Sequence, residues 1–274
     1  GAAGKSTVAK LLAKKLNLTY IDTGAMYRAV ALKATRLGIN LENEEEYKFL
    51  DSTTIDFINS HIYLDGEDVS EAIRNQEMSN KASFVSKFGY VRTILVAMQQ
   101  KLASSKNIVM DGRDIGTVVL PNANLKVFMS ADVEVRALRR LKERFDKTGE
   151  TISLEETINE LKARDLQDST RPISPLKQAD DAVFLDTSKL SVNEVIEEIT
   201  NLVFKRGYSM ENLEQKNVIV EETEVEETPV ENAAEVAEEA AEGKYKEMQV
   251  VKGVVVEVQE AQPAKKIGQK EIKA

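Results

Sequence analysis

The first 206 residues alternate short apolar runs with segments in which apolar residues recur every three or four positions. The periodic segments predict helices, beginning at residues 6–16. The short runs predict buried strands at residues 18–21, 107–110, 125–129 and 183–185. This alternation is typical of an α/β fold with a parallel sheet flanked by helices. Ligands of such sheets bind beyond the carboxyl ends of the strands, so we expect the chemical motifs to converge there.

Residues 40–75 break this alternation. Residues 54–59 and 61–64 predict two short strands around a turn, and Asp65-Gly66 is a hairpin signal. We interpret this stretch as a small lobe inserted into the main fold.

Two helices farther along carry their own start signals. Ser153 and Ser191 each precede a Glu by three residues, which is the capping-box pattern. Pro172 disfavours helical backbone at Arg171, so we expect that arginine at a helix end facing a cleft.

The composition changes after residue 206. The formal net charge is -9, but residues 208–242 hold twelve Glu, one Lys and no Asp or Arg, which gives -11 and leaves +2 for the rest. We interpret residues 207–243 as an acidic disordered linker. Residues 248–258 predict a strand, and a single strand is not stable alone, so residues 244–274 are expected to be the start of a further β-rich domain.

The chain opens on a phosphate-binding signal, Gly4-Lys5-Ser6-Thr7, which is the second half of a P-loop. Alone this tetrapeptide is common by chance, but a predicted helix follows it, and a helix N-terminus attracts phosphate. Lys5 can reach the outer phosphates of ATP, and the Ser6 hydroxyl can ligate Mg²⁺. The expected ATP-binding residues are Gly1, Ala2, Ala3, Gly4, Lys5, Ser6 and Thr7. The loop's first glycine and its strand are missing from the sequence, so we expect an N-terminally truncated domain.

Two charged motifs directly follow predicted strands. In residues 22–28, the Asp22 carboxylate can orient waters around Mg²⁺, and Arg28 can grip a phosphate with two parallel hydrogen bonds. In residues 111–116, two carboxylates and an arginine follow an apolar strand, where they are costly unless paired or used. An ordinary strand–turn–helix and a structural ion pair are the alternative interpretations.

Arginines also cluster on predicted helices. Arg136, Arg139, Arg140 and Arg144 share a helix face, which predicts either a solvated basic surface or an arginine-bearing lid. With a P-loop in the same chain, we favour the lid. His61 is the only histidine and lies in the inserted lobe, so we expect it to be structural. Phosphoryl transfer to a monophosphate needs positioning and charge neutralisation more than a base, because that phosphate's second pKa is about 6.

Five motifs, in this order and spacing, resemble those of bacterial cytidylate (CMP) kinase over about residues 1–205: GKST, DTGAMYRAV, EDVSEAIR, DGRDIGTVV and RDxxDSTRxxSPL. The resemblance implies the P-loop nucleoside monophosphate kinase fold, with an inserted monophosphate-binding lobe and a lid. It implies ATP as phosphate donor, Mg²⁺ as cofactor and CMP or dCMP as acceptor.

The resemblance also implies individual roles. The catalytic residues would be Lys5, Arg113, Arg136, Arg139 and Arg140. Ser6 and Asp22 would serve Mg²⁺. The CMP phosphate would lie along Thr23, Arg28 and Arg113, the cytosine near Ser83, Arg92, Asp114 and Arg171, and the ribose near Arg164 and Asp168. Gln167 stands where some family members have another arginine, and residues 186–188 would border the adenine.

Other interpretations stay open. Residues 248–258 also resemble the first strand of a ribosomal-type RNA-binding OB-fold repeat, which implies RNA or the ribosome as a partner of a fusion protein, and a nonspecific β-rich tail is the alternative. A P-loop kinase for another small acceptor is a third interpretation. No apolar run approaches the length of a membrane span, and there are 0 Cys for disulfides or thiolate metal sites. We expect a cytoplasmic monomer whose kinase domain binds neither membrane nor nucleic acid.

Overall fold

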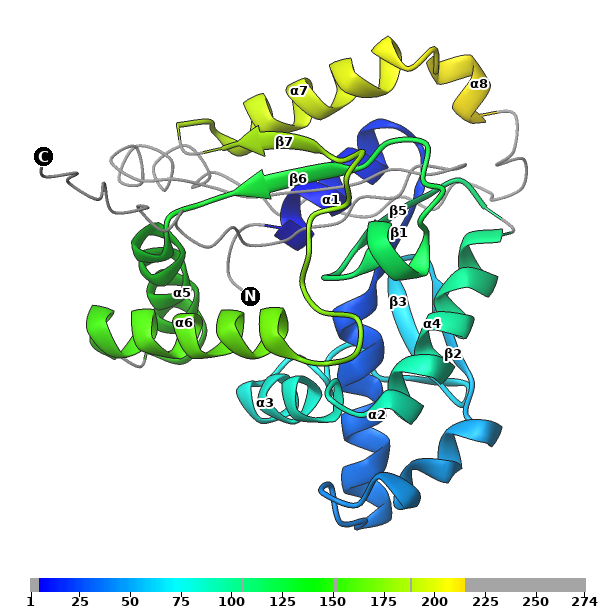
Figure 1. The fold of residues 1–274 in the computed structure, drawn as a ribbon, viewed down its shortest axis with the longest axis vertical. Coiled ribbons are helices and arrows are strands. Elements are labelled where there is room, and N and C mark those ends of the chain that lie inside the picture. Colours follow the sequence, from blue (N-terminus) through cyan, green and yellow to red (C-terminus); the bar gives the residue numbers. More distant parts are fainter. Residues whose placement is uncertain (1–4, 105, 150–151, 188, 215–274) are drawn as a thin grey trace, which may run out of the picture.

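The computed structural model describes residues 5–104, 106–149, 152–187 and 189–214. Its main body is built from parallel strands and the helices that cover them (Figure 1). These elements are α1 (Lys5–Lys15), β1 (Thr19–Asp22), α2 (Thr23–Leu37), α4 (Gly89–Ser104), β5 (Ile108–Asp111), β6 (Val127–Ser130), β7 (Val183–Asp186) and α7 (Val192–Lys205).

The strands pair in parallel, as predicted. Thr19 lies opposite Ile108 in the β1–β5 pair, and Val127 lies opposite Val183 in the β6–β7 pair. Among the described residues the two pairs form separate two-stranded sheets. They share one hydrophobic core, because residues of α1, β5, β6 and α7 pack in a single cluster that includes Leu12, Val109, Val127 and Ile199.

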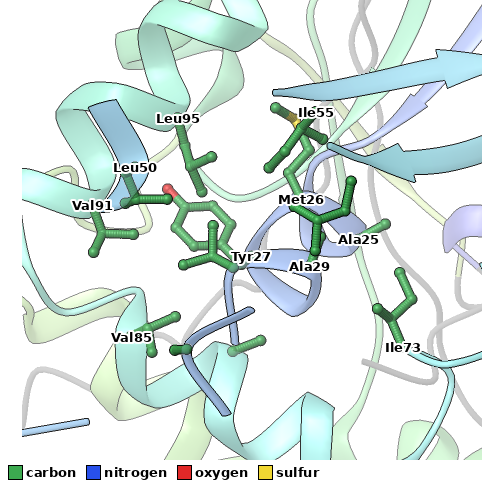
Figure 2. Packing of buried hydrophobic residues seen from close by; sticks show 14 of the residues in the cluster. Ala25, Met26, Tyr27, Ala29, Leu50, Ile55, Ile73, Val85, Val91 and Leu95 are labelled. Atoms are coloured by element: carbon green, nitrogen blue, oxygen red, sulfur yellow. The ribbon is translucent and has the colours of Figure 1, made fainter. Parts of the chain in front are cut away.

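The inserted lobe lies between α2 and α4. It contains the 3₁₀ helix η1 (Glu44–Ser52), β2 (Ile55–Ile58), β3 (His61–Leu64), β4 (Glu67–Asp68) and α3 (Gln76–Val85). Asp65 and Gly66 have φ angles of 50° and 85°, so they form the predicted turn between β3 and β4. A second cluster fixes the lobe to α2 and α4, and Figure 2 shows Met26 and Tyr27 projecting from α2 into it.

Two helices, α5 (Val133–Thr148) and α6 (Leu154–Thr170), pack on each other beside α3 (Figure 1). We call them the lid helices. The predicted capping boxes are present: Ser153 and Glu156 exchange hydrogen bonds at the start of α6, and Ser191 and Glu194 do so at the start of α7. Helix α6 ends at Thr170, and Arg171 has extended backbone, as its place before Pro172 predicted.

Two short elements complete the described chain, the π-helix η2 (Ile115–Val119) and α8 (Met210–Glu214). Leu213 of α8 is buried in the core beside α1, and its carbonyl accepts a hydrogen bond from Asn107 Nδ2 at 3.1 Å. The packed part of the chain therefore extends past residue 206, the boundary expected from the sequence. The rest of the acidic linker and residues 244–274 lie outside the described residues. No helix within the described ranges has the length and apolarity needed to cross a membrane.

Candidate nucleotide site

The carboxyl ends of β1 and β5 bring two sequence motifs together. Asp22 and Asp111 are partners in the strand register, and Thr23 Oγ1 donates to the Asp111 carbonyl at 2.7 Å. Gly112 is required at this point, because a Cβ there would lie 2.6 Å from Thr23 Oγ1 and 2.5 Å from Ile115 Cδ1. The motifs at residues 22–28 and 111–116 therefore form one surface.

The P-loop helix α1 reaches the same surface through Ser6. Ser6 Oγ donates to Asp111 Oδ2 at 3.1 Å, and the Tyr20 hydroxyl donates to Asp111 Oδ1 at 3.2 Å. Burial, and then the charges of Asp111 and Asp22, raise the pKa of Tyr20 well above its ordinary value, so its hydroxyl stays a donor. Sequence reasoning did not assign Asp111 a role, although it is the first carboxylate after an apolar strand. Residues 1–4 lie outside the described residues.

Asp22 has local partners instead. Its carboxylate accepts from Ala25 N at 2.9 Å, which caps α2, and from Arg28 Nη2 at 2.8 Å. The expected metal residue and the expected phosphate-binding arginine are thus paired with each other. Both side chains keep more than a fifth of their surface exposed, at 22% for Asp22 and 24% for Arg28, so a ligand can reach them.

Three arginines and two carboxylates, drawn from α4, the segment after β5 and the end of α6, meet beneath this surface. Arg92 Nη2 pairs with Asp114 Oδ2, and Arg171 Nη2 lies 4.0 Å from Asp114 Oδ1. Arg171 Nη1 also lies 3.4 Å from Asp168 Oδ1, and Arg113 Nε pairs with Asp168 Oδ2. We call Arg92, Arg113, Asp114, Asp168 and Arg171 the arginine–aspartate cluster. Each carboxylate is shared by two guanidinium groups, and the cluster carries a formal charge of +1.

Burial and neighbouring charges both shift the pKa values of Asp168 and Arg171. Burial acts to raise the pKa of the Asp168 carboxyl, but the nearby charges of Arg113, Arg164 and Arg171 hold that pKa below its usual range. Burial, and then the charge of Arg92, lower the pKa of Arg171. Asp168 is therefore ionised at neutral pH although it is buried.

One wall of the cluster contains buried polar atoms that have no hydrogen-bond partner among the described residues. Arg92 stacks over the Tyr27 ring, with Cζ 5.4 Å from the ring centroid. Burial raises the pKa of Tyr27 to about 12. Arg92 Nε, Arg171 Nη2 and the Tyr27 hydroxyl are buried without a hydrogen-bond partner among the described residues. Buried donors of this kind are costly unless a ligand or water accepts from them, which fits a polar ligand at this place.

The expected lid arginines lie on α5 with distinct partners. Arg136 is buried and donates from Nη2 to Asp165 Oδ2 at 2.8 Å. Arg140 Nη2 donates to Gln76 Oε1 of α3 at 2.9 Å, so the lid helices contact the inserted lobe. Burial lowers the pKa of Arg139 to about 9. Arg144 lies 4.0 Å from Glu160 and joins α5 to α6.

The remaining predicted residues fall at two places. Arg164, on α6, lies near enough to Asp168 to lower the pKa of its carboxyl. Ser83, near the end of α3, accepts hydrogen bonds from Gln167 of α6. His61 pairs with Asp68 at 2.7 Å on the exposed face of the lobe, away from the cluster.

The comparisons with known proteins agree with this geometry. The family model described as cytidylate kinase matches residues 1–205. A cytidylate kinase of Caldanaerobacter subterraneus is 50% identical over 204 residues, which cover 74% of this chain and 91% of the relative. Cytidylate kinases of Thermotoga maritima and Acholeplasma laidlawii are 46% and 45% identical, covering 75% and 73% of this chain and 94% and 90% of the relatives. The chain therefore belongs to the cytidylate kinase family.

Proposed function

We propose that this protein transfers the γ-phosphoryl group of ATP to CMP or dCMP, giving CDP or dCDP and ADP. The arginine–aspartate cluster is the observation that carries the proposal. It joins the DGRD motif to the RDxxDSTR motif and lies beside Thr23 and Arg28 at the strand ends. A monophosphate nucleotide offers a charged phosphate, a ribose and a polar base, and this surface offers a matching group for each.

The exposed cations would bind the acceptor phosphate. Arg28 and Arg113 keep 24% and 21% of their side chains exposed, and each is now held by a carboxylate. A phosphate carrying nearly two charges competes for these guanidinium groups through stronger, bidentate hydrogen bonds. Thr23 lies at the same surface, and Asp168 and Arg164 would hold the ribose.

The buried end of the site would hold cytosine. Arg92 and Arg171 present donors to the base acceptors, and the Asp114 carboxylate presents an acceptor. Cytosine carries an exocyclic amino donor where uracil carries a carbonyl oxygen. A carboxylate near that position favours the amino group and repels the carbonyl, so the site favours cytosine.

Transfer itself needs placement and charge neutralisation. The bond between the γ-phosphorus and its bridging oxygen to ADP breaks as an oxygen of the CMP phosphate bonds to that phosphorus. Lys5, Arg136, Arg139 and Arg140 would neutralise charge on the phosphates. Mg²⁺ fits beside Ser6, because the Ser6 hydroxyl and the Asp111 carboxylate are adjacent oxygen ligands of the type that this ion prefers. When bound, the ion neutralises charge on the ATP phosphates.

Turnover of the full-length protein with ATP and a panel of CMP, dCMP, UMP and AMP tests the proposal. We expect CMP and dCMP to be used far better than UMP or AMP. Arg171→Ala should damage CMP use much more than ATP binding, whereas Arg74→Ala should change neither, because Arg74 is a 61% exposed side chain of the lobe. A preference for UMP, AMP or a non-nucleotide acceptor would refute the assignment.

Three further expectations stay predictions. Residues 248–258, whose resemblance to an OB-fold strand implies RNA or the ribosome as a partner and whose alternative is a nonspecific β-rich tail, lie outside the described residues. A cytoplasmic location and a monomeric state are proposals that fractionation and light scattering would test.

A further inference from the structure

Gln167 makes two hydrogen bonds that none of these roles explains. It is half-buried on α6, directly before Asp168 in the sequence. Its Nε2 donates to the Ser83 carbonyl at 3.0 Å and to Ser83 Oγ at 3.1 Å. Ser83 lies on α3 of the inserted lobe, 84 positions earlier, so one amide group joins a lid helix to the lobe. Figure 1 shows α3 beside the end of α6.

These contacts close a ring around the expected base site. The Ser83 carbonyl also accepts from Ser86 Oγ at 2.8 Å, and Arg92 Nη1 donates to the Ser86 carbonyl at 3.2 Å. Arg92 leads on through the arginine–aspartate cluster to Asp168, the sequence neighbour of Gln167. Ser83 is therefore the point at which α3 joins the walls of the base site.

We propose that Gln167 is a positioning residue that fixes Ser83 for contact with the pyrimidine base, and so contributes to acceptor selectivity. This inference rests on the proposed function. A serine hydroxyl has one hydrogen and two lone pairs, and its side chain has three staggered rotamers. Gln167 fills one lone pair and, through the carbonyl, also fixes the backbone that carries the hydroxyl. The hydrogen and the second lone pair are left for a ligand in a defined direction.

A general tether between lid and lobe would be a different role, and the structure contains a matched control for it. Arg140 of α5 and Gln76 at the start of α3 also join a lid helix to α3, with an N–O distance of 2.9 Å. Within the described residues the Gln76 amide bonds to Arg140 and Asn80 and makes no hydrogen bond to Ser83. Loss of the Gln76 contact removes a tether and leaves Ser83 held.

The experiment compares Gln167→Ala, Gln167→Glu, Gln76→Ala, Ser83→Ala and the double variant Gln167→Ala/Ser83→Ala in the full-length protein. Steady-state kinetics give kcat and KM for CMP, UMP and ATP. We expect Gln167→Ala to raise KM for CMP by about 3- to 15-fold, the value of one or two hydrogen bonds, while KM for ATP stays within about twofold. The nearly isosteric Gln167→Glu should behave alike, because a carboxylate cannot donate to the Ser83 carbonyl.

Selectivity for CMP over UMP, and the energetic coupling between Gln167 and Ser83, distinguish a positioning role from a general tether. The ratio of kcat/KM for CMP over UMP should fall in Gln167→Ala and stay unchanged in Gln76→Ala. The double variant should be no worse than Ser83→Ala, because Gln167 acts by positioning the Ser83 hydroxyl, which is absent from both variants. Losses that multiply in the double variant, or equal effects of Gln167→Ala and Gln76→Ala on the ratio, would overturn the inference while leaving CMP kinase activity intact. A wild-type protein that does not phosphorylate CMP would refute the proposed function and this inference together.

Discussion

Asp114→Asn tests whether the arginine–aspartate cluster stabilises the fold as an ionised network. The Asp114 side chain is only 7% exposed, and its carboxylate is shared by Arg92 and Arg171, whose side chains are 3% and 5% exposed. An amide has nearly the same shape, so packing changes little. The substitution removes the negative charge and leaves two buried guanidinium groups beside a neutral partner.

The geometry sets the magnitude. At the 4.0 Å separation between Arg171 Nη2 and Asp114 Oδ1, an effective dielectric constant of about 20 gives an attraction of about 4 kcal/mol. Removing one partner of a buried ion pair typically costs about 3–5 kcal/mol. For a domain of this size each kcal/mol lowers Tm by about 2–4 °C, so we expect Tm to fall by about 6–20 °C.

Calorimetric or circular dichroism melts at pH 7 measure this change. The matched control is Glu67→Gln, because Arg36 binds Glu67 with short hydrogen bonds of 2.6 and 2.8 Å while the two side chains are 44% and 56% exposed. Water screens that pair, so we expect its Tm to stay within about 2 °C of wild type. An Asp114→Asn protein that melts no lower than Glu67→Gln would refute the view that Asp114 offsets buried positive charge.

Three other changes have defined outcomes. Gly112→Ala would place a Cβ 2.6 Å from Thr23 Oγ1. We therefore expect overpacking to lower the free energy of unfolding by about 1–3 kcal/mol and kcat/KM for CMP to fall. An unchanged free energy of unfolding in a denaturant titration, together with unchanged kinetics, would contradict this. Tyr20→Phe removes a donor to Asp111, so the Mg²⁺ concentration for half-maximal activity should rise about 3- to 10-fold, and an unchanged Mg²⁺ titration would contradict this. Because the folded pKa of Asp168 is depressed, its stability contribution is complete above the unfolded pKa of about 3.9 and is lost as pH falls through the folded value. The Tm difference between wild type and Asp168→Asn should therefore shrink below about pH 4, whereas a constant difference in melts from pH 7 to acid would count against it.

The predictions that the structure confirmed depend on local chemistry. The capping boxes at Ser153 and Ser191 and the turn at Asp65-Gly66 each involve residues close in sequence, so the pattern alone defines the geometry. The extended backbone at Arg171 follows from the ring of the next proline in the same way.

Partners distant in sequence could not be predicted from pattern. Asp22 and Asp111 both follow apolar strands, and only the fold shows that Asp111 lies against Ser6 while Asp22 is held by Arg28. The contact between Gln167 and Ser83 could likewise not be predicted from the sequence, because it requires α6 to pack against α3. The burial of Leu213 was not predicted either, because α8 is short and its only other apolar residue is Met210, so that burial depends on the core against which Leu213 packs.

The shared carboxylates of the arginine–aspartate cluster limit the routes by which this sequence can evolve. Replacing one carboxylate raises the formal charge of the cluster from +1 to +2, whereas changing an arginine and a carboxylate together keeps it at +1. The effect of each substitution therefore depends on which others have already occurred. A lineage that shifts toward a different acceptor must either pass through an intermediate sequence of low stability or first acquire stabilising substitutions elsewhere in the chain.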